Sequence, residues 1–239
     1  TAEDPVSLTP AGPRQVQLNA RIGWSFAAAM RTFLRADPDI IMIGEMRDPE
    51  TAKIAVEASL TGHLVLSTLH TNSAPESITR LLEIGLDPFM FSDSLLAILA
   101  QRLVRRLCTK CRQAETLAPH ALRDLAQLYI ESSAGRGETM DALIERWQRQ
   151  HSDGQGRVVV YRRQGCAQCD HSGYQGRMGV HELMVANDAA RELIRHRAPA
   201  AELQAAALAT GMVTLRQDGI EKVLAGLTDL PEVLAATNQ

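Results

Sequence analysis

The chain has 239 residues, of which 45% are hydrophobic and 4% aromatic, and its formal net charge at pH 7 is −3. The near-balanced charge excludes a strong field for nucleic acids or anionic membranes, and the few aromatic rings exclude a stacking platform for single-stranded nucleic acid. We therefore expect no nucleic-acid partner. No apolar run approaches the length of a membrane span, and the polar opening segment is not a signal peptide, so we expect a cytoplasmic protein with at most a peripheral membrane role.

The first half of the chain alternates predicted strands and helices. Apolar periodicity, capping residues and breakers predict loop and short strand over residues 1–20, helices over 24–35, 49–60 and 73–85, and strands over 40–43 and 63–69. The wholly apolar run 40–43 is typical of a strand buried on both faces. A further helix capped by Asp87 and Pro88 is predicted to carry Leu95, Leu96, Leu99, Leu103 and Leu107. This order favours an α/β fold with a parallel sheet.

The second half is expected to be mainly helical. Residues 112–152 have a helical and polar pattern, with loops at 135–137 and 152–156, and a short strand follows over 158–161. Helices are predicted over 188–197, 199–209 and 214–225, with a short last one after Pro231. The last third of the chain therefore forms a small helical subdomain in this interpretation.

Glu45, Arg47 and Asp48 follow the predicted strand 40–43. Ligands of open α/β sheets bind beyond the carboxyl ends of the strands, where a nucleotide hydrolase needs a carboxylate beside Mg²⁺ and the attacking water. The alternative is a solvated acidic turn that caps the helix beginning at Pro49. The spacing leaves both interpretations open.

Ser67, Thr68 and His70 close the next predicted strand. If the two strands are neighbours, these side chains point toward the same crevice as Glu45. A structural role is the commoner one for a single histidine, and it stays an alternative here.

Four arginines near these segments form another candidate set: Arg31, Arg35, Arg47 and Arg80. Arginines of ATPases stabilise charge on the transferring phosphate. Taken alone, the four are more simply interpreted as members of surface ion pairs, which contribute little to stability.

The four cysteines give the strongest local signal, because they form two C-x-x-C pairs, Cys108 with Cys111 and Cys166 with Cys169. Two such pairs in a cytosolic chain indicate metal before disulfide. Four thiolates make a closed tetrahedral zinc site, which is structural. The alternatives are unliganded structural cysteines or a redox pair.

Several segments resemble the ATPases of type II secretion and type IV pilus assembly. Residues 37–48 (DPDIIMIGEMRD) resemble the Walker B segment of that family, and residues 61–72 (TGHLVLSTLHTN) resemble its histidine box. Residues 100–108 (AQRLVRRLC) are similar to the entry to its zinc domain, and residues 173–182 and 215–226 match its terminal segments. The resemblance runs from about Glu3 to Thr237.

The resemblance implies a role for each candidate residue. Glu45 would position the Mg²⁺-bound or attacking water, Glu3 of the aspartate box would be the general base or water orienter, and His70 would sense the γ-phosphate. The expected nucleotide-side and intersubunit residues are Asp4, Thr68, Arg31, Arg35, Arg47 and Arg80. Zinc would be bound by Cys108, Cys111, Cys166 and Cys169.

The resemblance also implies an architecture and an assembly. We expect a RecA-like parallel-sheet core over 1–107, incomplete on its N-terminal side, a zinc-binding insertion over 108–187, and a C-terminal helical subdomain over 188–239. The intact protein would be a hexamer that uses ATP and Mg²⁺. Its partners would be an inner-membrane platform protein and a cytoplasmic membrane-anchor component.

Three departures from the family pattern refine this expectation. The phosphate-binding loop G-x-x-x-x-G-K-[ST] does not occur in the sequence, so we expect the isolated chain to be nearly inactive. Ser7 stands where the aspartate box usually closes with a glutamate, and Gly44 precedes Glu45 in place of an aspartate, which suits water-mediated metal contact. Retraction motors of the pilus system lack the four cysteines, so the chain resembles an assembly or secretion motor.

A second hypothesis of another class is a zinc-stabilised interaction module without catalytic activity of its own. The presence of both the Glu45 segment and the His70 segment argues against it, because an adaptor needs neither.

Overall fold

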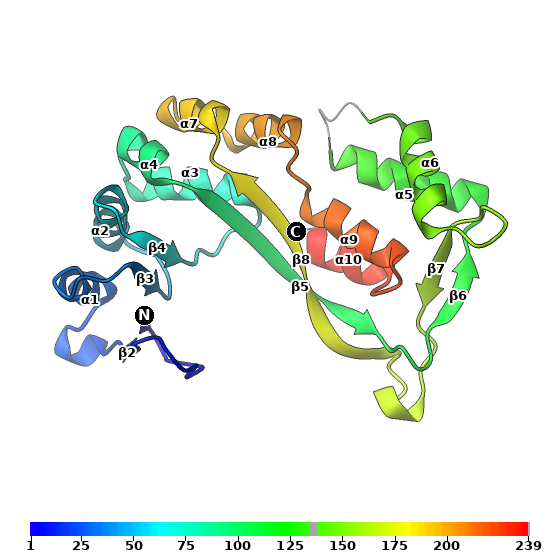
Figure 1. Cartoon of the computed structure of the whole chain (residues 1–239), viewed down its shortest axis with the longest axis horizontal. Coiled ribbons are helices and arrows are strands. Elements are labelled where there is room, and N and C mark those ends of the chain that lie inside the picture. The colour runs from blue at the N-terminus through cyan, green and yellow to red at the C-terminus, as the bar shows by residue number, and fades with distance from the viewer. Residues whose placement is uncertain (134–137, 239) are drawn as a thin grey trace. The chain divides into compact units, whose positions relative to one another are not determined.

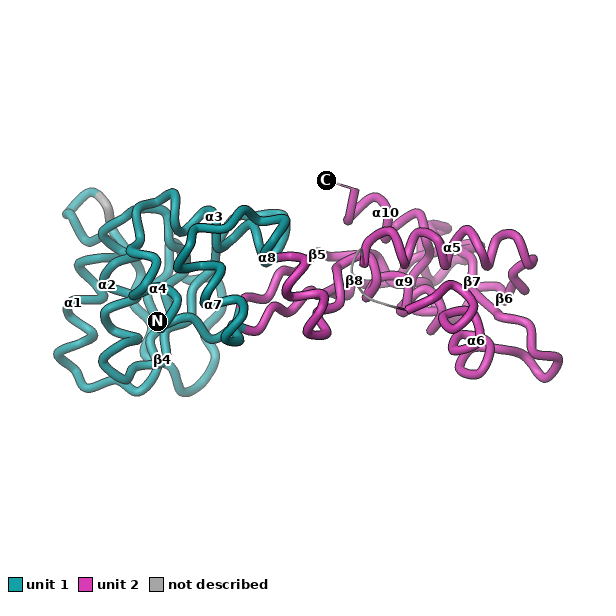
Figure 2. The backbone as a smooth tube through the Cα atoms, turned by 90° about the horizontal axis from the view of Figure 1, so that it is seen from above, with its two compact units in different colours: residues 1–97, 186–203 teal, residues 98–185, 204–239 magenta. Residues whose placement is uncertain are grey.

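The computed structural model describes residues 1–133 and 138–238, which form two compact units (Figure 1, Figure 2). Unit 1 comprises residues 1–97 and 186–203, and unit 2 comprises residues 98–185 and 204–239. The loop expected over 135–137 lies outside the described residues. No helix within the described ranges combines the length and the apolar character that a bilayer span requires.

Unit 1 is built around a four-stranded sheet whose strands pair in parallel in the order β2-β1-β3-β4. The parallel sheet expected from the sequence is thus confirmed. Its strands are β1 (Ala2–Glu3), β2 (Val16–Gln17), β3 (Ile40–Ile43) and β4 (Leu64–Ser67). Its helices are η1 (Ala20–Ile22), α1 (Phe26–Phe33), α2 (Pro49–Leu60), α3 (Ala74–Ile84), α4 (Pro88–Ser94) and α7 (Asp188–Arg195).

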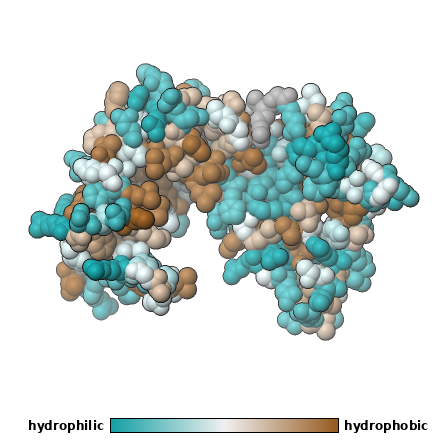
Figure 3. Space-filling model, viewed as in Figure 1, coloured by the Kyte–Doolittle hydropathy of each residue, from teal (hydrophilic) through white to brown (hydrophobic). Residues whose placement is uncertain are grey.

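The core of unit 1 lies between the sheet and the helices α1 and α2. Ile41 and Ile43 of β3 pack there with Met30 of α1 and Ile54 of α2. The prediction that 40–43 is buried on both faces is wrong, because its residues alternate between buried and exposed. These two helices cover one face, and four side chains on the other stay at least 38% exposed, namely Ile40, Met42, Leu64 and Leu66. Figure 3 shows apolar surface over this part of unit 1.

The helices of unit 1 begin where the sequence places their caps. The side chain of Asp48 accepts from the N–H of Thr51 at the start of α2, and Ser73 accepts from the N–H of Glu76 at the start of α3. Helix α3 ends at Gly85, whose φ of 109° places it in the left-handed region that glycine adopts without strain.

Unit 2 combines two strand pairs with helices. Strand β5 (Ala97–Leu107), whose first residue belongs to unit 1, pairs with β8 (Tyr174–Val185), and β6 (Gln113–Thr116) pairs antiparallel with β7 (Val159–Arg162). The helices are α5 (Pro119–Glu131), α6 (Met140–His151), η2 (Ala167–Cys169), α9 (Leu215–Leu224) and α10 (Leu230–Thr237). Helix α8 (Ala200–Ala209) begins in unit 1 and ends in unit 2.

The core of unit 2 centres on two rings. Trp147 of α6 is fully buried and meets Tyr129 of α5 edge to face, with the ring centroids 5.5 Å apart. Ile220 and Val223 of α9 and Val158 close the same cluster. The predicted C-terminal helices are confirmed as α7, α8, α9 and α10.

The prediction of a helix running on through Leu107 is wrong. Helix α4 ends at Ser94, and Leu95 already has extended backbone angles. The hydroxyls of Ser92 and Ser94 donate to the carbonyls of Phe89 and Phe91 within the last turn, a pattern that weakens helices. Pairing with β8 then satisfies the backbone of residues 97–107 as a strand.

Candidate functional site

Glu45, Arg47 and His70 meet at the carboxyl ends of β3 and β4. A carboxylate oxygen of Glu45 lies 2.6 Å from Nε of Arg47 and 3.4 Å from Nε2 of His70. The side chain of Glu45 is only 16% exposed, whereas those of Arg47 and His70 are 72% and 80% exposed. The shielded carboxylate of Glu45 therefore contacts the exposed side chains of Arg47 and His70 at the edge where open α/β sheets bind ligands.

The helix cap that follows does not use Glu45. Both carboxylate oxygens of Asp48 are engaged by Thr51, one by its N–H at 2.8 Å and the other by its hydroxyl at 2.7 Å. Asp48 thus fulfils the capping role that the sequence left open for this acidic turn. Glu45 is left to face His70.

Thr68 ties the two strand ends together. Its hydroxyl donates to the carbonyl of Gly44, and its own carbonyl accepts from the N–H of Met46 at 3.1 Å. Since β3 and β4 pair from Ile40 opposite Leu64 to Ile43 opposite Ser67, these contacts continue the pairing past the strands. They fix the turn that carries Glu45 beside the turn that carries His70.

Glu3 lies on the neighbouring strand β1 and has partners of its own. Its carboxylate accepts from Nε2 of Gln15 at 2.9 Å and from the hydroxyl of Thr1 at 2.7 Å. These bonds, chiefly the one from Gln15, lower the pKa of Glu3 below its usual range. The carbonyl of Ala2 accepts from the N–H of Gly44 at 2.8 Å, which places β1 beside the end of β3. The adjacent Asp4 is exposed.

Two of the four candidate arginines pair with carboxylates other than Glu45, and a third is exposed. Arg31 pairs with Glu50, Arg80 with Glu83 at 3.5 Å, and Arg35 is exposed. All the side chains in these two pairs are more than half exposed, so the pairs themselves contribute little to stability. Only Arg47 contacts another candidate residue, Glu45.

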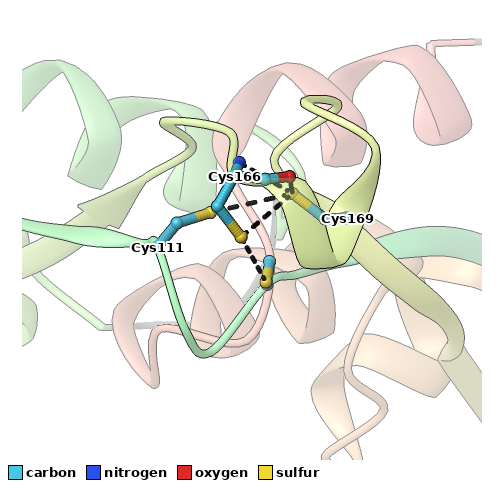
Figure 4. Close-up of side chains that lie close together, drawn as sticks. Cys111, Cys166 and Cys169 are labelled. Atoms are coloured by element: carbon cyan, nitrogen blue, oxygen red, sulfur yellow. Dashed lines mark hydrogen bonds between the residues drawn. The ribbon is translucent and has the colours of Figure 1, made fainter.

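The four cysteines converge in unit 2, and Figure 4 shows Cys111, Cys166 and Cys169 pointing toward one another. All four sulfurs lie within 4.8 Å of one another. The Sγ–Sγ distances are 4.0 Å for Cys108 with Cys166, 3.9 Å for Cys111 with Cys169, and 3.7 Å for Cys166 with Cys169. A tetrahedral zinc with Zn–S bonds of about 2.3 Å separates its sulfurs by about 3.8 Å. The donor set therefore fits one zinc ion.

Backbone N–H groups point at one of these sulfurs. The N–H groups of Cys166 and Gly173 donate to Sγ of Cys169 at 3.2 and 3.3 Å. Burial disfavours the thiolate of Cys169, but these bonds outweigh burial and lower its pKa. Burial raises the pKa of Cys111. The backbone therefore favours the thiolate of Cys169, while burial disfavours that of Cys111.

Sequence reasoning did not identify the residues that support this cluster. Tyr174 is 7% exposed, and its hydroxyl donates to Oδ2 of Asp229 at 2.8 Å. The guanidinium carbon of Arg105 lies 4.1 Å from the centroid of its ring. The adjacent glycine and tyrosine, four and five residues after Cys169, were the only signal in the sequence. Their partners lie far along the chain.

The model of one protein family, described as Type II/IV secretion system protein, matches residues 1–235. The chain belongs to this family.

Relatives within the family serve two systems. The chain is 47% identical to the type IV pilus assembly ATPase PilB of Myxococcus xanthus, over 99% of this chain and 38% of that protein. It is 42% identical to the type II secretion system ATPase E of Vibrio cholerae, over 100% of this chain and 42% of that protein. The chain thus spans about two fifths of the length of these relatives.

Solved structures agree on the fold. The pilus retraction motor PilT, crystallised with bound ADP, superposes with a TM-score of 0.59 at 27% identity, over the whole of this chain and 52% of that one. The Legionella pneumophila ATPase DotB superposes with a TM-score of 0.58 at 18% identity, over 98% of this chain and 49% of that one. The family is thus one of secretion and pilus ATPases, and the expected resemblance is confirmed.

Proposed function

We propose that the chain is the C-terminal portion of a hexameric ATP-hydrolysing motor that powers type II secretion or type IV pilus assembly. The observation that carries the proposal is the placement of the Glu45 carboxylate, which faces His70 and Arg47 while Asp48 caps the helix. A zinc-stabilised interaction module has no use for this arrangement.

The chain's own residues divide the chemistry in this proposal. Glu45 orients the attacking water or a water on Mg²⁺, Glu3 is the second carboxylate on the neighbouring strand, and His70 senses the γ-phosphate. ATP and Mg²⁺, when bound, supply the transferring phosphoryl group and the charge that neutralises it. Asp4 and Thr68 stand on the nucleotide side, and the four arginines, Arg31, Arg35, Arg47 and Arg80, serve nucleotide binding and intersubunit contacts.

The proposal also covers the zinc site, the domain boundaries and the membrane partners. Zinc at the four cysteines is structural, because four thiolates leave no open coordination position. The family resemblance divides the chain at 107/108 and 187/188 into core, zinc insertion and helical subdomain, whereas the two compact units divide it at 97/98, 185/186 and 203/204. The assembled motor works at the cytoplasmic face of the inner membrane, bound to a platform protein and a cytoplasmic membrane-anchor component.

The test replaces the matching segment of the Myxococcus xanthus relative with this chain and measures ATP turnover. Glu45→Gln keeps the size of the side chain but removes the charge that activates water. We expect turnover to fall by about 10²-fold or more, as is typical for the loss of a positioned catalytic carboxylate, while nucleotide binding persists.

Glu57→Gln is the matched control, because the side chain of Glu57 is half exposed and pairs with Lys53 at 3.9 Å. Turnover of this variant should equal that of the unsubstituted chimaera. If Glu45→Gln retains full turnover while the chimaera is active, Glu45 has no catalytic role and the proposal fails.

A further inference from the structure

Gly173 lies between one cysteine of each pair. Its N–H donates to Sγ of Cys169 at 3.3 Å, and its carbonyl accepts from the N–H of Cys108 at 2.9 Å. Its φ of +78° belongs to the left-handed region, and a Cβ built there would lie 2.6 Å from Cβ of Arg163. A single residue therefore contacts both halves of the cysteine cluster through its backbone alone.

Tyr174, the residue after Gly173, has partners at both its hydroxyl and its ring. Its hydroxyl donates to Asp229 at 2.8 Å and accepts from Nη1 of Arg163 at 3.4 Å. The guanidinium groups of Arg105 and Arg163 lie 4.1 and 5.3 Å from the centroid of its ring, within the range of cation–π attraction. The side chain that follows Gly173 is thus held at its ring and at its hydroxyl.

Asp229 connects this contact to the last helix. Its Oδ1 accepts from the N–H of Glu232 and caps α10, while its Oδ2 accepts from Tyr174. Nearby, the hydroxyl of Thr228 donates to the carbonyl of Arg105, and the N–H of Leu107 donates to the carbonyl of Leu227. The corner between α9 and α10 is therefore bonded both to the strand that leads to Cys108 and to the residue that follows Gly173.

We propose that Tyr174 is a positioning residue of the metal site. Its bond to Asp229 holds the Gly173 peptide where it supports Cys169 and Cys108. The inference rests on the zinc proposed above for the four cysteines. Hydrogen bonds behind the ligands orient them and tune their basicity, and losing such a partner typically costs a metal site 10–100-fold in affinity.

The test measures zinc release from the 239-residue chain to a chromophoric chelator. Tyr174→Phe keeps the ring and removes the bond to Asp229, and we expect it to release zinc about tenfold faster. Asp229→Ser keeps a cap for α10 but is too short to reach Tyr174, so it should have the same effect. The double variant should be no faster than either single one, because both changes remove one bond.

Tyr129→Phe is the matched control, since it also removes a buried hydroxyl in unit 2, one that accepts from Arg146 at 3.4 Å. It should leave zinc release unchanged. The visible spectrum of the Co²⁺-substituted chain reports thiolate geometry, and it should change in Tyr174→Phe but not in Tyr129→Phe.

Three results would overturn the inference. If Tyr174→Phe releases zinc at the original rate, or if Tyr129→Phe accelerates release equally, Tyr174 has no specific role at the site. A chain that contains no stoichiometric zinc would instead refute the metal assignment, and the inference would fall with it.

Discussion

Glu45 and Asp48 stand three residues apart in one turn, yet their carboxylates have different partners. Asp48 is bonded to Thr51 through both oxygens, whereas Glu45 faces Arg47 and His70. The sequence shows only two acids after a strand, because the choice between cap and site depends on the pairing of β3 with β4. That pairing is long-range, and local spacing does not specify it.

Tyr174 provides a test at the scale of one residue. Burial, and then its bond to Asp229, raise the pKa of Tyr174 from 10 to about 12. Because the folded state holds this proton more tightly than the unfolded state, the stabilisation is complete below pH 10 and is lost as the pH rises toward 12. Subtracting the ultraviolet titration of Tyr174→Phe from that of the original chain should isolate one phenol with a midpoint near 12.

The same comparison applies to stability. Between about pH 10 and 12, the free energy of unfolding should fall more steeply in the original chain than in Tyr174→Phe. Equal slopes, or a difference titration centred near 10, would show that Tyr174 is solvated and that its bond to Asp229 is not maintained in solution.

Residues 95–107 show, at the scale of elements, why one pattern supported two structures. Leucines at 95, 99, 103 and 107 recur every four residues, which suits one face of a helix. Four is also a multiple of two, so Leu99, Leu103 and Leu107 occupy positions that share one face of a strand, whereas Leu95 precedes β5. Pairing with β8 makes this segment a strand, and a local sequence pattern carries no information about that long-range pairing.

Element ends were more predictable than element types here. Pro49, Ser73 and Gly85 mark helix boundaries that the structure reproduces, because capping bonds join residues only a few positions apart. The strand β8 was not predicted, although Val180, Glu182 and Met184 alternate with exposed residues. A buried glutamate interrupted the apolar alternation that identifies a strand.

Gly226 gives a prediction for the end of α9. Its φ is +71°, and a Cβ there would lie 2.5 Å from Cδ2 of Tyr161, whose ring also contacts the guanidinium of Arg112. Gly226→Ala should therefore destabilise unit 2 by about 2–4 kcal/mol, which combines left-handed strain of about 1–2 kcal/mol with overpacking. Urea unfolding measures the change.

Two other glycines separate the causes. Gly211 has a φ of +102° and open space around it, so Gly211→Ala should show the backbone strain alone. Gly154 also has open space and no positive φ, so Gly154→Ala should be near neutral. If Gly226→Ala cost no more than Gly211→Ala, the contact with Tyr161 would have no energetic importance.

At the scale of the whole molecule, the sequence predicted which residues gather at a site better than it predicted which surfaces are buried. The cysteine spacing indicated a metal cluster, and the sulfurs do converge. The prediction that β3 is buried on both faces was wrong, since Ile40 and Met42 stay exposed. An apolar run shows that both faces of a strand could be buried, but whether each face is buried depends on the elements that cover it.

In the function proposed above, Glu45 is the catalytic carboxylate of a motor, and the phosphate-binding motif that such a motor needs does not occur in these 239 residues. The most direct measurement compares ATP turnover of the 239-residue chain alone with that of the chimaera described above. We predict turnover in the chimaera and almost none in the chain alone, because backbone N–H groups of the loop cradle the phosphates. Equal turnover in both, or none in a folded chimaera that binds ATP, would contradict the claim.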